Sequence, residues 1–141
     1  GPRPPPGEVM ATILARDGNG QADEALLEAV RTYMQRDDVS PGTDNVTVQS
    51  AKIVEYEQRV VVQIGQGPDP QITEESVKQS LQAYANQQHK LAAEIQPDFI
   101  SHLLYSQGVR RAQVVSPSVP IVCDADQAPW CTAIVVEVQR L

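Results

Sequence analysis

The spacing of apolar side chains predicts a long strand in the middle of the chain. Between residues 44 and 65 apolar and polar positions alternate, first around Val46 and Val48 and again over residues 60–64. A period of two residues is typical of a β-strand, because successive side chains point to opposite faces. Residues 8–16 also alternate but are apolar on both faces, which predicts a strand covered from two sides.

Three stretches have the features of helices. In residues 22–36 apolar side chains recur every three or four positions, and Asp23 and Glu24 complement the positive end of the helix dipole. A second helix is expected over residues 73–89, with Thr73 as its N-cap. A third begins at Pro97 and ends at Gly108. Its inward side chains are expected to be Phe99, Ile100, Leu103 and Leu104.

Further strands are expected at residues 111–115, 121–123 and 132–138, with a turn over residues 124–129. The order of elements predicts an α+β fold of two small subdomains, strand-helix-strand and then a ferredoxin-like β-α-α-β-β unit. We expect three segments. They are a proline-rich linker over residues 1–8, the strand-helix part of a middle subdomain over 9–44, and a C-terminal α+β subdomain over 45–141.

Charge and composition narrow the class of partner. The 141 residues carry a formal net charge of −7, and the pI is near 4.7. Phosphate recognition needs clustered Lys and Arg, so proteins are expected as partners, not nucleic acids or anionic membranes. No apolar run approaches the ~20 residues that span a bilayer, and the N-terminus resembles no export signal. Gly1, Pro2 and the prolines after them predict a soluble C-terminal piece of a longer protein.

Two cysteines, Cys123 and Cys131, lie on either side of the expected turn. A disulfide across that turn is geometrically allowed, whereas two small, buried, reduced side chains are what a cytosolic protein would contain. The spacing is not that of a structural zinc site. Both states of the pair stay open at this point.

No convincing catalytic or metal-binding constellation is present. Residues 17–28 place oxygen-bearing side chains at positions one, three, five and twelve of a calcium loop, but Ala22 stands where that loop needs glycine. A strand-to-helix turn is the preferred interpretation. His89 and His102 lack a second ligand at a useful spacing, and Asp124 and Asp126 are expected to be solvated. We therefore expect no enzyme activity, no cofactor and no metal.

Three stretches together resemble the C-terminal region of the baseplate J-like family, the wedge proteins of contractile phage tails and related injection machines. The first, residues 11–51, has a strand, an Asp-Gly-x-Gly turn, a helix and the ending Thr-Asp-x-Val-Thr-Val-x-Ser-Ala. The second, residues 89–117, has Gly-Val before a strand with a Ser-Pro stop, and the third is residues 127–138. The three cover nearly the whole chain in the family's order.

The resemblance implies a structural subunit without catalytic residues. Copies would pair into wedges around a hub and spike, contact the neighbouring wedge protein and the sheath initiator, and transmit the trigger for contraction. It also implies a location in the tail baseplate, with assembly in the host cytoplasm. The positions singled out as architectural are Asp44, Val46, Val48 and Ser50 at the junction between subdomains, and Trp130 as interface anchor or strand cap. A second interpretation is a small ligand-binding ferredoxin-like regulatory module.

Overall fold

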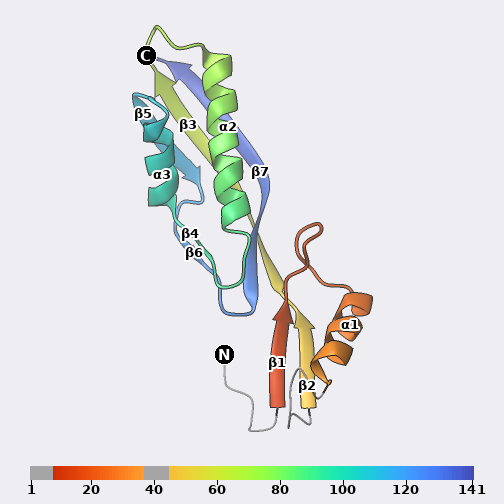
Figure 1. The fold of residues 1–141 in the computed structure, drawn as a ribbon. Coiled ribbons are helices and arrows are strands. Elements are labelled where there is room, and N and C mark those ends of the chain that lie inside the picture. Colours follow the sequence, from red (N-terminus) through yellow and green to blue (C-terminus); the bar gives the residue numbers. More distant parts are fainter. Residues whose placement is uncertain (1–7, 37–44) are drawn as a thin grey trace.

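Two lobes joined by one nearly continuous strand make up residues 8–36 and 45–141, the part of the chain that the computed structural model describes (Figure 1). The long strand expected in the middle of the chain is confirmed as β2 (Asn45–Ser50) and β3 (Lys52–Ile64), separated only by Ala51. We call residues 8–36 and 45–50 the N-lobe and residues 52–141 the C-lobe. The strand changes its pairing partners at Ala51.

The N-lobe is a two-stranded sheet with one helix. β1 (Glu8–Ile13) pairs in parallel with β2, from Glu8 opposite Asn45 to Ile13 opposite Ser50. α1 (Glu24–Met34) packs against β2, and its N-cap Asp23 accepts a hydrogen bond from the amide of Leu26. β1 was expected to be covered from two sides. That expectation is wrong, because Met10 is 53% exposed and the only helix described in this lobe packs on one face.

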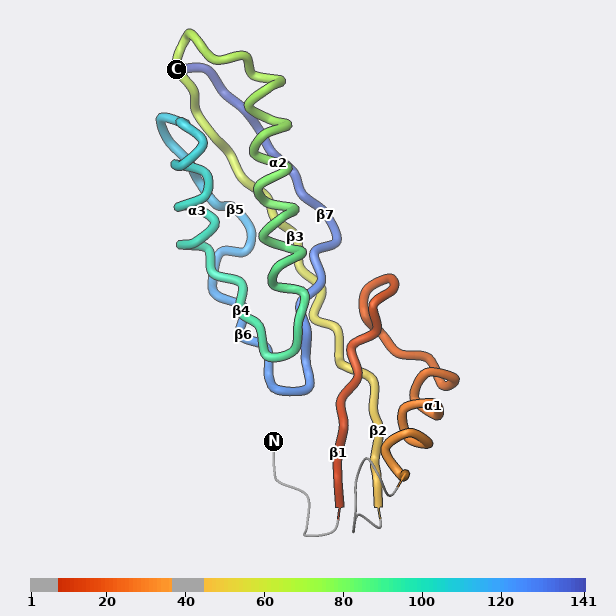
Figure 2. Tube along the Cα trace, in the orientation of Figure 1, coloured from red at the N-terminus to blue at the C-terminus, as the bar shows by residue number. Residues whose placement is uncertain are grey.

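The C-lobe is a three-stranded sheet with helices on one face (Figures 1 and 2). β3 is central, β5 (Arg111–Ser116) pairs antiparallel to it, and β7 (Gln127–Arg140) pairs parallel to it. α2 (Pro70–Gln87) packs on β7, and α3 (Pro97–Ser106) packs on β5. The mixed α+β class is confirmed.

The ferredoxin-like plan of the second unit is not confirmed. The short strand β6 (Ile121–Val122) does not join the main sheet; it pairs with β4 (Glu94–Ile95) in a separate two-stranded ladder. The main sheet also contains a parallel pair of neighbours. The domain boundaries expected after residues 8 and 44 stay predictions, and residues 1–7 of the expected linker lie outside the described part of the chain.

Two element boundaries differ from expectation for local reasons. Thr73 is not an N-cap, because α2 already begins at Pro70 and the side chain of Asp69 accepts a hydrogen bond from the amide of Gln71 at 2.8 Å. Proline suits this first turn, since its fixed φ is helical and its missing N–H has no partner to lose there. β7 begins at Gln127 instead of residue 132, because an edge strand tolerates Pro129.

The core of the C-lobe lies between the helices and the sheet. From Tyr56 onward the even-numbered residues of β3 point inward, and Val77, Leu81 and Tyr84 form the buried stripe of α2, as expected. The expected inward position of Phe99 is wrong, because its side chain is 44% exposed and its ring lies against that of Tyr84 with centroids 5.0 Å apart. Neighbouring Ile100 and Leu104, four residues apart, occupy the buried face of α3 instead.

Candidate interaction surfaces

The residues singled out in β2 form the inner face of the N-lobe. Val46 and Val48 are buried, and they share a small core with Ala22 and Leu27 of the α1 side. Their alternation puts both side chains on the face beneath the helix. They hold the N-lobe together and are not available to a partner. Asp44 lies outside the described residues.

Ser50 and Ala51 tie the loop before α1 to the junction of the lobes. The Ser50 hydroxyl accepts a hydrogen bond from the amide of Ala22 at 2.8 Å and donates one to the carbonyl of Ala51 at 3.1 Å. The amide of Ala51 donates to the carbonyl of Ile13 at 2.8 Å. These three bonds join β1, β2 and the loop within a few residues of the point where β3 begins. Ser50 lies next to the junction, and its expected architectural role there stays a prediction.

Trp130 packs against His89 beside the loop of the N-lobe. The two ring centroids are 4.9 Å apart, and His89 Nδ1 is 2.8 Å from the carbonyl oxygen of Pro129. The donor there is the imidazole, because a carbonyl can only accept. Among the described residues His89 Nε2 is buried without a hydrogen-bond partner, and it faces Gly20, where a Cβ atom would lie 3.0 Å from it. The loop at Gly20 thus packs against His89, which in turn stacks on Trp130, and we call this His89–Trp130 pair the seat of the loop. His89 and Gly20 are 69 positions apart, so the sequence does not reveal their contact.

A second feature that the sequence reasoning missed is a buried polar cluster in the C-lobe. Gln58 is fully buried; its Nε2 donates to the carbonyl of Leu81 at 3.1 Å and lies 3.6 Å from Cys131 Sγ. Its Oε1 has no hydrogen-bond partner in the part of the chain that the structure describes. The Tyr56 hydroxyl is also buried without a well-formed hydrogen bond, and burial raises its pKa. The signal was present, because Tyr56 and Gln58 continue the inward alternation of Val60, Val62 and Ile64.

The two cysteines are free thiols in the structure. Cys123 is buried, and burial together with the nearby Asp124 carboxylate raises its pKa. A thiol with a raised pKa stays protonated at neutral pH and is a poor nucleophile. The disulfide interpretation is not supported here, and the pair acts as small packing residues.

The loop considered for calcium uses its side-chain oxygens within the protein. Asn19 Oδ1 accepts a hydrogen bond from the amide of Gln21, and Asp23 Oδ1 accepts one from the amide of Leu26. These are the bonds of a turn and a helix cap. Within residues 8–36 and 45–141 no group of three His, Cys, Asp or Glu side chains is placed to hold a metal ion. His102 is exposed on α3, with its ring 6.0 Å from that of Phe99.

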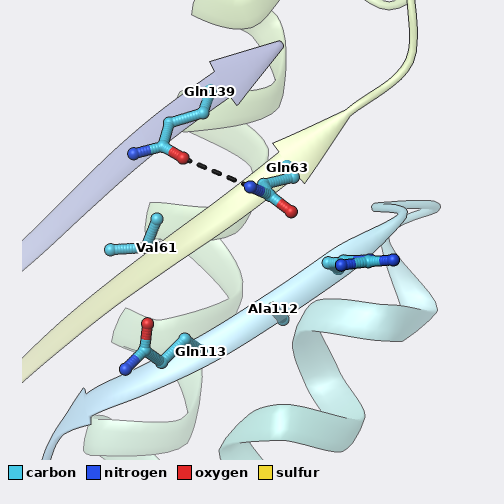
Figure 3. A pocket seen from close by; sticks show the side chains of 6 residues that line it. Val61, Gln63, Ala112, Gln113 and Gln139 are labelled. Atoms are coloured by element: carbon cyan, nitrogen blue, oxygen red, sulfur yellow. Dashed lines mark hydrogen bonds between the residues drawn. The ribbon is translucent and has the colours of Figure 1, made fainter. Parts of the chain in front are cut away.

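The face of the C-lobe sheet away from the helices carries a shallow hollow of about 340 Å³ (Figure 3). Val61 lies among polar side chains, and Gln63 Nε2 is 3.4 Å from Gln139 Oε1. The remaining lining residues are Arg111, Ala112 and Gln113. The space between helices and sheet, where a ferredoxin-like module would take a ligand, is filled by buried side chains.

No helix in the described part of the chain is both long and apolar enough to cross a membrane. Comparison with known sequences adds two findings. No family model matches the chain. Over 129 residues the chain is 37% identical to Baseplate protein J of Escherichia phage P2, a match that covers 92% of this chain and 43% of that protein. The chain thus spans less than half the length of this relative, and the match lies in the relative's C-terminal part.

Proposed function

We propose, from the premise that the chain belongs to the baseplate J-like family, that it is part of a structural subunit of a phage tail baseplate. The single observation that carries the proposal is the 37% identity over 92% of this chain to a protein named for the baseplate. Identity at this level over this length indicates a common fold. The function proposed is assembly, without catalysis.

In finer detail, the subunit belongs to a wedge of a contractile tail. Its partners are other baseplate proteins: neighbouring wedge subunits, the hub or spike, and the sheath initiator. Several copies are present in each tail. The protein resides in the tail baseplate of the virion and is assembled in the host cytoplasm.

The arrangement of the two lobes supports a mechanical role. β2 and β3 form one strand that runs through both lobes with only Ala51 between them, so a displacement of one lobe is passed along hydrogen-bonded backbone to the other. The hydrogen bonds of Ser50 and the seat formed by His89 and Trp130 stiffen that connection. We expect the contraction trigger to pass through this strand.

A genetic test is direct. The gene for the whole protein is deleted from the phage and restored from a plasmid, either intact or with a stop codon near its start as the matched control. The proposal predicts that complete tails containing the protein, and infectious phage, form only when the intact gene is supplied. Electron microscopy and mass spectrometry of purified particles provide the measurement. Normal tails in the stop-codon control would refute a structural role.

A further inference from the structure

The outer edge of β7 is the longest unpaired strand edge in the part of the chain that the structure describes. β7 has 14 residues, and the sheet order β5-β3-β7 leaves one side of it without a neighbouring strand. Its first residues are covered: Ala128 is fully buried, and the carbonyl of Gln127 accepts the amide of Ala92. The open stretch lies between Thr132, whose hydroxyl donates to the carbonyl of Tyr56, and Arg140 at the end of the strand; it is residues 133–139.

The direction of the backbone groups along this edge follows from two hydrogen bonds. The amide of Leu141 donates to the carbonyl of Ile64, and on the other side of β3 the amide of Arg110 donates to the carbonyl of Gln63. Even-numbered residues of β3 thus bond to β7, which engages the odd-numbered residues of β7. The amides and carbonyls of Ile134, Val136 and Val138 point outward, and they make no backbone hydrogen bond among the described residues.

The other edge of the same sheet is short and protected along its whole length, whereas β7 has such residues only near its ends, at Pro129 and Arg140. β5 has six residues, begins beside Arg110 and ends at Pro117. Short length, a basic residue and a proline are the usual means of blocking addition of a further strand. Residues 133–139 of β7 contain no proline, lysine or arginine, and their register with β3 is regular after the shift at Tyr56. An open edge of this length is a template for β-augmentation.

We infer that the edge of β7 at residues 133–139 binds an extended segment of a different protein by strand addition. The added strand would place apolar side chains beside Ile134, Val136 and Val138, which pack on the core of the C-lobe. On the other face its side chains would lie beside Val135, Glu137 and Gln139. No cation lies within 4.0 Å of the Glu137 carboxylate among the described residues. The segment therefore carries a lysine or arginine opposite Glu137.

The alternation of outward-pointing backbone groups along β7 argues against pairing with β7 of a second copy of the chain. Two copies related by a twofold axis would pair β7 with β7 in antiparallel fashion, with the outward even-numbered residues facing each other. Odd-numbered residues would then face odd-numbered ones, and those are Ala133, Val135, Glu137 and Gln139, none of them basic. Arg140 is even-numbered and never comes opposite Glu137. Pairing of β7 with β7 therefore leaves Glu137 without a basic residue opposite it.

Two synthetic nonapeptides test the edge on the chain itself. Both alternate valine and threonine, and one has lysine, the other glutamate, at the position opposite Glu137. Amide exchange is followed by NMR. We expect saturating lysine peptide to slow exchange at Ile134, Val136 and Val138 at least tenfold, while Val135 and Glu137, which already bond to β3, do not change. Unchanged exchange with both peptides would overturn the inference, as would protection of the free chain that rises with its own concentration.

Charge reversal tests the predicted partner chemistry. In Glu137→Lys the lysine peptide should bind about fivefold more weakly and the glutamate peptide correspondingly more tightly, since a cross-strand pair changes from attractive to repulsive. Glu75→Lys, the same change on an exposed position of α2, should alter neither affinity. Equal affinities in the wild type and in Glu137→Lys would overturn the assignment of a basic partner.

The same edge can be followed in assembled tails, an experiment that rests on the proposed function. Hydrogen exchange measured by mass spectrometry should show residues 133–139 protected in tails at least tenfold relative to the free protein. Equal exchange in tails that contain the protein would overturn strand addition and leave the proposed function intact. Absence of the protein from tails would instead refute the proposed function. The peptide measurements would still show whether the edge of β7 binds an added strand.

Discussion

The two lobes share one strand but differ in how much core they enclose. Among the described residues the C-lobe core contains twelve buried side chains beneath two helices, whereas the N-lobe core contains four beneath one. An isolated pair of strands is at best marginally stable in water, and a third strand or additional packing is needed for independent stability. The difference teaches that the C-lobe carries the stability and that the N-lobe depends on its attachment at Ser50 and Gly20.

Separating the two lobes into fragments should have the largest effect on folding. A fragment of residues 52–141 should unfold in one cooperative transition, because it retains the whole main sheet and both of its helices. A fragment of residues 1–51 should give the circular dichroism of an unfolded chain. The full chain, at the same concentration, is the reference. A folded N-terminal fragment would contradict the dependence of the N-lobe on the C-lobe.

Removing a core side chain should cost more in the C-lobe than anywhere else. Leu81 is fully buried on α2, so Leu81→Ala should lower the free energy of unfolding by roughly 2–5 kcal/mol. Urea denaturation followed by circular dichroism measures this. Ile72→Ala on the same helix is the control, since Ile72 is 66% exposed and its loss should cost little. Similar losses for the two variants would contradict the placement of the core.

The contact of the N-lobe loop with the C-lobe can be broken at Gly20. This residue has φ +96°, and an added Cβ would lie 2.2 Å from Leu14 Cδ1 and 3.0 Å from His89 Nε2. Gly20→Ala should cost about 1–3 kcal/mol, from backbone strain and from displacement of the loop. Trp130 fluorescence should change as its stacking on His89 loosens.

Two other glycines separate these causes. Gly18→Ala, at φ +60° in open space, should show the backbone cost alone, and Gly67→Ala, which meets nothing, should be neutral. If Gly20→Ala were as mild as Gly67→Ala, the seat at His89 would not exist in solution.

Alkaline pH should destabilise the C-lobe through Tyr56. Burial raises the pKa of this phenol, with nearby Cys131 adding to the effect, so the folded protein holds the proton at a pH where the unfolded chain, with a pKa of about 10, has lost it. Stability is unaffected at neutral pH and falls above about pH 10, by at most about 1.4 kcal/mol per pH unit for this group.

The raised pKa of Cys123 acts in the same direction from a lower pH. Tyr56→Phe should remove only the part of the dependence of unfolding free energy on pH that Tyr56 contributes. Denaturation at several pH values above 9 would measure this dependence. Tyr33→Phe in the N-lobe is the control, because Tyr33 is 55% exposed. A slope that is unchanged in Tyr56→Phe would contradict the burial of this hydroxyl.

The smallest effect is expected at Ser50. In Ser50→Ala the amide of Ala22 loses its partly buried acceptor, which should cost about 1 kcal/mol. Hydrogen exchange should report the loss in the N-lobe loop and not in the C-lobe. Ser106→Ala, which removes an exposed hydroxyl from the end of α3, should be nearly silent. Equal exchange changes in both lobes would mean that the lobes do not unfold separately.

Much of the fold could be predicted because its signals are local. The alternation over β2 and β3, the stripe of Val77, Leu81 and Tyr84, and Gly108 at the end of α3 all depend on residues within about four positions of one another. The candidate site was less accessible. Val46 and Val48 lie in the core of the N-lobe, and the roles expected for them and for Ser50 at the junction stay predictions. The stacking of Trp130 on His89, and the approach of His89 to Gly20, depend on packing between segments far apart in the chain.

By itself the sequence determined most of the strands and helices, and three of its stretches, residues 11–51, 89–117 and 127–138, resemble the baseplate J-like family. Only the tertiary structure decided that β6 leaves the main sheet and that β7 is an edge with an open side. The physical reason is that strand pairing joins residues more than 70 positions apart, as Lys52 and Gln127 show. Such pairs are selected by closure of the common core, which no local period encodes.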